Sequence, residues 1–422
     1  MKVVVLKKDK RFESRNDRSL GIQTYGENND YPQQVQMVVG ASGTGTSCLD
    51  VYSKFISGKG FFDTDFYKKI VNNDVQTNVY IIDQLSKDYA MFGGFAIHVN
   101  YNANFKIVSI SNIPFEHIRF EKLDEKGEFD RVAIHTDWGR QFTQLRKWKK
   151  DDIQFIHLFN PDPAEIQNQV ESAGGWEFYK GQVFYFSSSG YKTYPIPKFD
   201  SVLTDMNTEE GISNVNNRNA RNNFLTAGML IDKVQDNNSG ADDQSETEKA
   251  VLSFQGDENA GKILYIQVET AEEIPEFKSF SGTNYDKEFT VTRESVQDNI
   301  GQAFSQPPIL RAKDVGGNFG ADLMQNAYNF YNSVTENERM NMERVLSEIF
   351  KYWVESMQYD TTIQPLSFDV EMTLTERLGE KGFDQIMNII ENPNIVPIQK
   401  RKLVQRLFDL SDEEVNDLIP EL

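Results

Sequence analysis

The sequence has few cysteines, few histidines and too few cations to balance its acids. Cys48 is the one cysteine, so no intramolecular disulfide supports the fold, and we expect a buried structural thiol in a reducing compartment. Lys and Arg number 44 against 64 Asp and Glu, which gives a formal charge of −20. This balance excludes a basic protein that coats DNA without sequence preference.

Long apolar runs are also missing. The first eight residues hold a four-residue apolar run between charged residues, which is shorter than the core of a signal peptide. No stretch approaches the roughly 18 apolar residues of a membrane span. We therefore expect a soluble, unanchored protein made in the cytoplasm. Apolar residues at 39% and aromatic residues at 12% indicate an ordered chain, long enough for about three domains or one large extended one.

Motifs that mark an enzyme are absent from the sequence. No Gly-x-Ser-x-Gly nucleophile elbow occurs. Residues 40–47 have the glycine spacing and terminal hydroxyl of a phosphate-binding loop but lack its lysine, so we interpret them as a flexible linker. The histidines show no metal-ligand spacing and are expected at strand positions; they are His98, His117, His135 and His157. The sequence predicts no cofactor and no metal.

The first half of the chain predicts an arm, two helices and a β-rich block. Residues 1–45 carry Gly and Asn turn signals that indicate an extended arm. Apolar spacing predicts helices over 48–60 and 77–92, each closed by glycines. Between about 95 and 200, short runs rich in Val, Ile, Phe and Tyr alternate with turn residues, which is typical of antiparallel strands. These runs are 95–100, 106–110, 131–135, 153–159 and 182–186.

The second half is predominantly helical by its apolar pattern. The spacing predicts a moderately amphipathic helix over 212–232, then a polar module with a strand at 261–269, then a helix over 285–306 that Pro307-Pro308 stops. Residues 321–357 give the strongest helical pattern, with a kink expected at 335–339, where the apolar stripe thins out. Three short helices follow, over 382–391, over 399–408 and from Ser411 onward. Together these elements predict an α+β fold.

The order of elements between Ser213 and Trp353 resembles the portal proteins of tailed bacteriophages, the head-to-tail connectors of long-tailed phages. The resemblance runs through NARNNFLTAG at 219–228, NAGKIL at 259–264 and the segment 288–308 that ends in Pro-Pro. A glycine-rich loop then leads into the long helix that ends in ERVLSEIF at 343–350. No single segment is specific to this family, but the order of helix, strand-bearing insert, helix, Pro-Pro, glycine loop and long helix is much more specific than any one of them.

The resemblance implies a wing, stem, clip and crown architecture of α+β class, with long helices and a β-rich N-terminal wing. It assigns an N-terminal arm and wing to 1–211, a first stem helix to 212–232, a clip to 233–284, a second stem helix to 285–306, a tunnel loop to 307–320, a long wing helix to 321–357, and the wing end and crown helices to 358–422.

The resemblance also implies a function without catalysis or cofactor. Such proteins form a ring, usually of twelve copies, at one capsid vertex of the virion after assembly in the host cytoplasm, with no membrane involved. Double-stranded DNA passes through the channel during packaging and ejection, and the terminase large subunit, the major capsid protein and the head–tail adaptor bind the ring. The implied DNA-proximal residues are Arg311, Lys313, Gly316, Gly317 and Asn318. The implied clip residues for terminase docking are Asp242, Asp243, Glu246, Glu248 and Lys262.

Two other classes of function stay open at this point. The β-rich block from 95 to 200 could belong to a carbohydrate- or nucleotide-processing enzyme, which would need a cleft with paired carboxylates. The chain could also be a capsid or tail component that forms no ring. A closed oligomer of about twelve chains is required by the portal interpretation alone.

Charge reversal in the implied tunnel loop tests its contact with DNA. We expect Lys313→Glu and Arg311→Glu to impair DNA packaging or retention while rings still assemble, because sparse cations on an acidic wall make the transient phosphate contacts. DNA content per particle is the measurement. Unchanged DNA filling in both variants would remove these residues from the mechanism.

Overall fold

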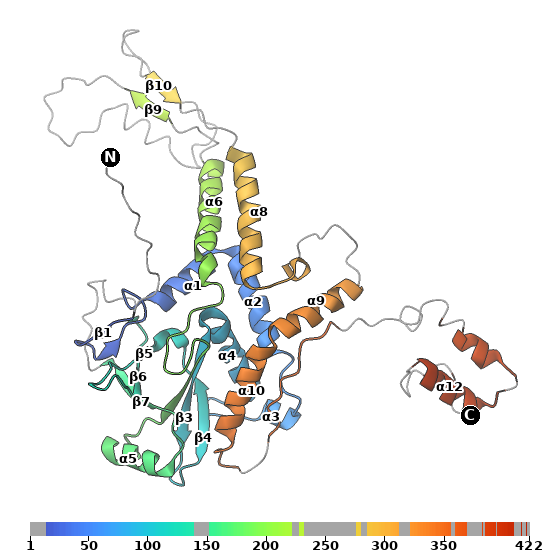
Figure 1. Cartoon of the computed structure of the whole chain (residues 1–422), viewed down its shortest axis with the longest axis horizontal. Helices are drawn as coiled ribbons and strands as arrows, with labels where there is room; N and C mark the ends of the chain where they lie inside the picture. Colours follow the sequence, from blue (N-terminus) through green and yellow to red (C-terminus); the bar gives the residue numbers. More distant parts are fainter. Residues whose placement is uncertain are drawn as a thin grey trace. The chain divides into compact units, whose positions relative to one another are not determined.

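The computed structural model (Figure 1) describes residues 14–138, 152–221, 228–231, 276–279, 285–311, 321–355, 359–368, 382, 385–393, 395–408, 415 and 419. The chain divides into two compact units. The first comprises Met1–Phe319 and Asn326–Leu366, and the second Gly320–Gln325 and Ser367–Leu422. Long helices and a mixed sheet confirm the predicted α+β class.

Six described strands of the first unit build a sheet in the order β4-β3-β8-β7-β6-β5. The strands are β3 Gly94–Tyr101, β4 Ile107–Asn112, β5 Ile118–Phe120, β6 Arg131–Ile134, β7 Gln154–Leu158 and β8 Gln182–Ser187. Cross-strand pairing fixes the register, since Phe95 lies opposite Phe186 with ring centroids 4.9 Å apart. All five strand segments predicted between 95 and 200 are confirmed, and β5 was not predicted. The strand predicted at 261–269 lies outside the described residues.

One pairing contradicts the prediction of an antiparallel block. Strands β7 and β8 are parallel because helix α5, Pro163–Ala173, carries the chain back between them. Asp162 caps this helix by accepting from the amide of Ala164, Pro163 presets its first turn, and Gly174 ends it at φ 92°. The short apolar stripe of Ile166 and Val170 gave too weak a helical signal.

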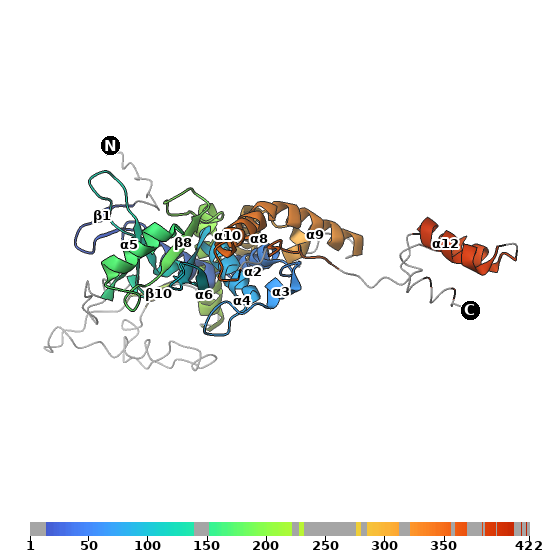
Figure 2. The same cartoon turned by 90° about the horizontal axis from the view of Figure 1, so that it is seen from below.

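Helices pack beside the sheet or on one another. They are α1 Tyr31–Ala41, α2 Gly43–Ser57, α3 Thr64–Lys68, α4 Asn78–Phe92, α9 Ala321–Val334 and α10 Glu336–Phe350. Helix α9 contacts α2, where the rings of Tyr331 and Phe55 lie 4.8 Å apart. Helix α4 contacts β3, α2 contacts α4, and α10 contacts α2, so these helices lie together beside the sheet (Figure 2). One continuous core joins them to the strands. Helix α4 confirms the prediction for 77–92, and Gly93 ends it in the left-handed conformation.

The predicted extended arm over 1–45 is wrong for its second half. Helix α1 occupies 31–41, because Pro32 presets the first helical turn and Val35 and Val39 recur on one buried face. The predicted linker at 40–47 is also wrong, because it is the end of α1 and the start of α2. Cys48 lies in α2, fully buried as expected, and burial raises the pKa of its thiol to about 11.

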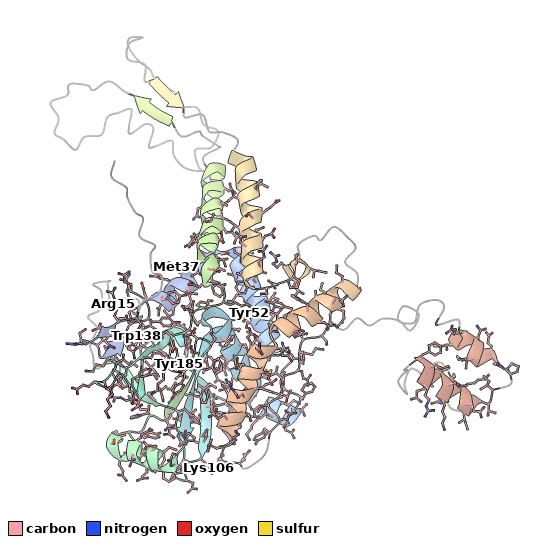
Figure 3. All side chains as sticks on the ribbon, in the orientation of Figure 1. Arg15, Met37, Tyr52, Lys106, Trp138 and Tyr185 are labelled. Carbon is pink, nitrogen blue, oxygen red and sulfur yellow. The ribbon has the colours of Figure 1, made fainter. Side chains whose placement is uncertain are left out.

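Fully buried Arg119 ties the arm to the sheet. The hairpin of β1, Asn16–Asp17, and β2, Ile22–Gln23, precedes a turn at Asn29 with φ 61°. From β5, Arg119 donates to the Asn29 side chain at 2.5 Å and to its carbonyl at 2.8 Å. The guanidinium also lies 5.2 Å from the ring centre of Trp138, which is labelled in Figure 3. Burial lowers the pKa of Arg119 to about 10, which leaves the cation charged.

The predicted long helix over 321–357 is two helices, α9 and α10, and ends at Phe350. The break falls at Thr335, inside the predicted kink. The hydroxyl of Thr335 donates to the Tyr331 carbonyl at 3.0 Å and so competes with the helical hydrogen bonds.

The second unit has a small core of its own. Ile386, Val404 and Val415 are buried together. Residues 385–391 are helical and α12 spans Pro397–Phe408, which confirms the two predicted helices at 382–391 and 399–408. The start of the third, at Ser411, lies outside the described residues. Among the described helices, none combines the length and apolar character needed to cross a bilayer.

Replacing Arg119 with methionine tests its structural role. We expect Arg119→Met to lower the free energy of unfolding by about 3 kcal/mol, because the carbonyls of Asn29 and Ile118 lose their donor while buried. Arg131→Met on neighbouring β6 is the control: its side chain is 42% exposed and pairs with Glu121, so we expect a change within about 1 kcal/mol. Urea unfolding measures both. Equal losses in the two variants would contradict this assignment.

Candidate functional site

Two long helices of equal length stand side by side on the first unit (Figure 1). They are α6 Leu203–Arg221 and α8 Tyr285–Ala303, with 19 residues each, or about 28 Å at 1.5 Å per residue. Strand β9, Gly228–Ile231, follows α6, and strand β10, Glu276–Ser279, precedes α8; the two strands pair antiparallel. We call α6 and α8 the stem pair.

The stem pair confirms one predicted helix and corrects the other. Helix α8 begins where the prediction for 285–306 begins and ends three residues earlier, at Ala303. The helix predicted over 212–232 begins instead at Leu203. The apolar pattern missed its first part because Glu209 lies on the buried face and interrupts the apolar stripe of Leu203, Met206 and Ile212. Its predicted end at 228–231 is strand β9, since a distant segment provides hydrogen bonds there.

The stem pair is fixed to the body at a partly buried polar cluster that we call the stem root, formed by Ser42, Thr44, Glu209 and Gln297. Glu209 is 7% exposed, and its carboxylate accepts from the Ser42 hydroxyl at 2.5 Å and the Thr44 hydroxyl at 2.6 Å. It also accepts from the Thr44 amide and the Gln297 side chain, both at 3.2 Å. The stem root therefore joins α6 and α8 to the first turn of α2.

The position of Glu209 is an anion site. Free backbone amides at a helix N-terminus favour negative charge, and Ser42 caps α2 by accepting from the Gly45 amide at 2.9 Å. Burial raises the pKa of Glu209, but the hydrogen bonds from Ser42, Thr44 and Gln297 outweigh it and hold the pKa below its usual value. The chain's own carboxylate thus takes the place that a phosphate takes in a phosphate-binding loop, which argues against nucleotide binding at 40–47.

The other end of α2 meets a cation. Arg339, in the first turn of α10, is 6% exposed and donates to the Phe55 carbonyl at 2.9 Å. It also donates to the Thr335 hydroxyl at 2.7 Å and the Asn332 carbonyl at 2.6 Å. A cation at a helix C-terminus complements the helix dipole. Tyr52, labelled in Figure 3, adds a hydrogen bond from α2 to Glu338 at 2.9 Å. Both ends of α2 are therefore held by side chains of the opposite charge.

Of the residues implied at the tunnel loop and clip, Arg311 is described. It lies at the end of η7, Pro308–Arg311, and its guanidinium rests against α8 with 11% of the side chain exposed. The other implied loop residues lie outside the described part: Lys313, Gly316, Gly317 and Asn318. The implied clip residues also lie outside it: Asp242, Asp243, Glu246, Glu248 and Lys262. The implied roles of these nine residues stay predictions, and so does the implied DNA contact of Arg311.

The stem root itself was not predicted from the sequence. The phosphate-loop resemblance of 40–47 rested on its glycine spacing and on the hydroxyl residue at its end, so Ser42 and Thr44 were not singled out, and their partner Glu209 is one of 64 acidic residues. Two features could have indicated the stem root: Glu209 on an otherwise apolar helix face, and Ser42 at a position typical of a helix N-cap.

Within the described residues, no group of three or more His, Cys, Asp or Glu side chains could hold a metal ion. His98 lies in β3 and His157 in β7, at strand positions as expected. His117 ends η1, Phe115–His117, and His135 directly follows β6.

A pocket of about 820 Å³ lies between β7, β8 and α10. Aromatic side chains such as Tyr89 and Phe186 line it together with Lys192 and Arg344, and Glu348 is the one carboxylate among its lining residues in the described structure. A glycosidase requires two carboxylates on opposite sides of the scissile bond. The described lining of this pocket therefore does not provide the carboxylate pair of a glycosidase.

No family model and no curated protein matches this chain. Solved structures do. The virion of a native gene transfer agent particle matches at 12% identity and TM-score 0.44, covering 89% of this chain and 93% of the other. The neck of the native particle computed with C12 symmetry matches at 12% identity and TM-score 0.43, and the match covers 92% of this chain and 93% of the other. An HK97 family phage portal protein from Corynebacterium diphtheriae matches at 9% identity and TM-score 0.37, and the match covers 69% of this chain and 82% of the other. These neighbours are a virion, the neck of a particle and a phage portal protein.

The ionised Glu209 gives the stem root a pH dependence. Because its pKa in the folded chain lies below the ordinary value of 4.5, its stabilising contribution is complete above that value and is lost as the pH falls through the lowered pKa. We expect Glu209→Gln to reduce the free energy of unfolding by about 2 kcal/mol at neutral pH. We expect this difference to shrink in acid.

Unfolding of the wild type and the variant across the acid range measures this effect. Glu210→Gln, one residue along α6, is the matched control and should change little. A difference between Glu209→Gln and wild type that stays constant from neutral to acid pH would show that the charge is not what holds the root.

Proposed function

We propose that this chain is a portal-type subunit, twelve copies of which close into a ring at one capsid vertex with the stem pairs around a DNA channel. The observation that carries the proposal is the stem pair. It consists of two antiparallel helices of equal length, anchored by the stem root at one end and joined at the other end by an inserted module (Figure 1). The sequence resemblance supports the same assignment.

The surface of α8 supports the need for neighbours. All five residues from 290 to 294 are exposed, and Val291 is 67% exposed on this helix. A two-helix hairpin buries the facing side of each helix, and helical stability in proteins comes mainly from such packing. A ring gives every stem pair two adjacent copies, which would cover the outer faces that one chain leaves in water.

The insert between the stem helices fits a docking module. Strands β9 and β10 hold its two ends together, so the clip in this proposal begins at Gly228 rather than at residue 233. Its acidic residues Asp242, Asp243, Glu246 and Glu248, with Lys262, would meet the terminase large subunit and later the head–tail adaptor. The body of the first unit would face the major capsid protein.

The charge of the chain suits a channel for a polyanion. Twelve copies would carry 12 × −20 = −240, and an acidic wall repels DNA rather than gripping it. Strong phosphate binding would oppose movement, because each neutralised phosphate adds salt-dependent affinity. Translocation energy then comes from the terminase motor, and this chain performs no reaction of its own.

Native mass spectrometry of the full chain tests the proposal. We expect a closed oligomer of twelve 48.5-kDa chains, about 580 kDa. Val291→Arg should shift the population toward monomers without changing monomer stability, because it places a charge in the interface between stem pairs. Val108→Arg on edge strand β4, where Val108 is 40% exposed, is the control and should leave the ring intact. A wild-type chain that stays monomeric at high concentration and in particles would overturn the proposal.

A further inference from the structure

The guanidinium of Arg311 lies directly on the backbone of α8 at Gly301. An ideal Cβ on Gly301 would lie 2.2 Å from Nη1 and 2.3 Å from Cζ of Arg311. Every residue larger than glycine would displace this head group. The pair of Gly301 and Arg311 therefore specifies a close approach between the last helical turn of α8 and the end of η7.

Arg311 is partly paired in this position. Its Nη1 donates to the Gln297 carbonyl at 3.1 Å and forms an ion pair with Asp298 at 3.5 Å. Its Nε is buried and has no hydrogen-bond partner in the described structure. Gln297 in turn donates its side chain to Glu209. Arg311 thus connects the turn after α8 to the residue that links both stem helices.

The turn between Gly301 and Arg311 contains a residue with a strained backbone and a buried side-chain amide without hydrogen-bond partners. Ser305 has φ 54°, a left-handed conformation unusual for a residue with a side chain. Gln306 is 4% exposed, and neither atom of its amide group has a partner in the described structure. Buried polar groups without partners are costly, so contacts from outside the turn must hold it. Tyr331 donates to the Phe304 carbonyl at 3.1 Å at its start, and Arg311 contacts α8 at its end.

We propose that Arg311 is a positioning residue that clamps the turn 304–311 onto α8, rather than a residue that itself binds DNA. In this role it sets the point at which the chain leaves α8 toward Lys313. The consequence for DNA rests on the proposed portal function, whereas the clamp does not, so the two are measured separately.

Hydrogen exchange on the DNA-free full chain measures the clamp. The amides of Phe304, Ser305 and Gln306 form the hydrogen bonds of the turn. We expect Arg311→Ala to speed their exchange at least about tenfold. Gly301→Ala should do the same, although it keeps the guanidinium, because the new methyl group displaces it. The double variant should show no further increase, since both changes break one contact.

Two further variants complete the design. A Cβ on Gly211 in α6 would meet no atom within 4 Å, so Gly211→Ala is the matched control and should leave the exchange of the turn unchanged. Arg311→Lys keeps the charge but loses the planar guanidinium that lies on Gly301, so it should resemble Arg311→Ala. Exchange that is unchanged in Gly301→Ala, or effects that add in the double variant, would overturn the clamp.

DNA retention by assembled particles then separates positioning from direct contact. A clamp predicts that Gly301→Ala loses as much retention as Arg311→Ala. A direct phosphate contact predicts instead that Gly301→Ala and Arg311→Lys, which both keep a cation, retain DNA like wild type; that result would also overturn the proposal. A chain that forms no ring would refute the portal function and leave the exchange result standing.

Discussion

The described structure depends on helix α2 and on the opposite charges that hold its two ends. Glu209 lies at the N-terminus of α2 and Arg339 at its C-terminus, each with the sign that complements the helix dipole. Both come from parts of the chain far from α2 in sequence. Through these contacts α2 carries the stem pair at one end and the junction of α9 and α10 at the other, so the long-range arrangement of the first unit is fixed by electrostatics as well as by its apolar core.

The buried arginines share a way of binding. Arg119 and Arg339 donate mainly to carbonyl and amide oxygens, which gives directional anchors to the backbone without the need to bury a partner carboxylate. Each joins a segment to an element distant in sequence: the arm to the sheet, and α10 to α2. Arg311 differs because its hydrogen bonding is incomplete and its neighbours are strained. Arg311 therefore holds its segment with fewer complete hydrogen bonds than Arg119 and Arg339 do.

Much of the fold was predictable where periodicity and capping agreed. The helix at 77–92, the helix from 285 and the five strand segments follow from apolar spacing that tertiary contacts reinforce. Predictions failed where a polar residue stood on a buried face, as Glu209 does in α6, or where a partner distant in sequence decided the conformation, as β10 does for β9. The parallel pairing of β7 with β8 depended on the undetected helix α5. Predictions about the tunnel loop and clip lie largely beyond the described residues.

By itself, the sequence determined the α+β class, the acidic character and the succession of helix, insert, helix and proline stop. These are properties of local spacing and composition, which act over a few residues. The tertiary structure alone decided that Glu209 fills the anion site of α2 and that Arg311 lies on Gly301. Both depend on bringing together residues that are ordinary in sequence, because a carboxylate or a glycine acquires its role only from the atoms placed against it.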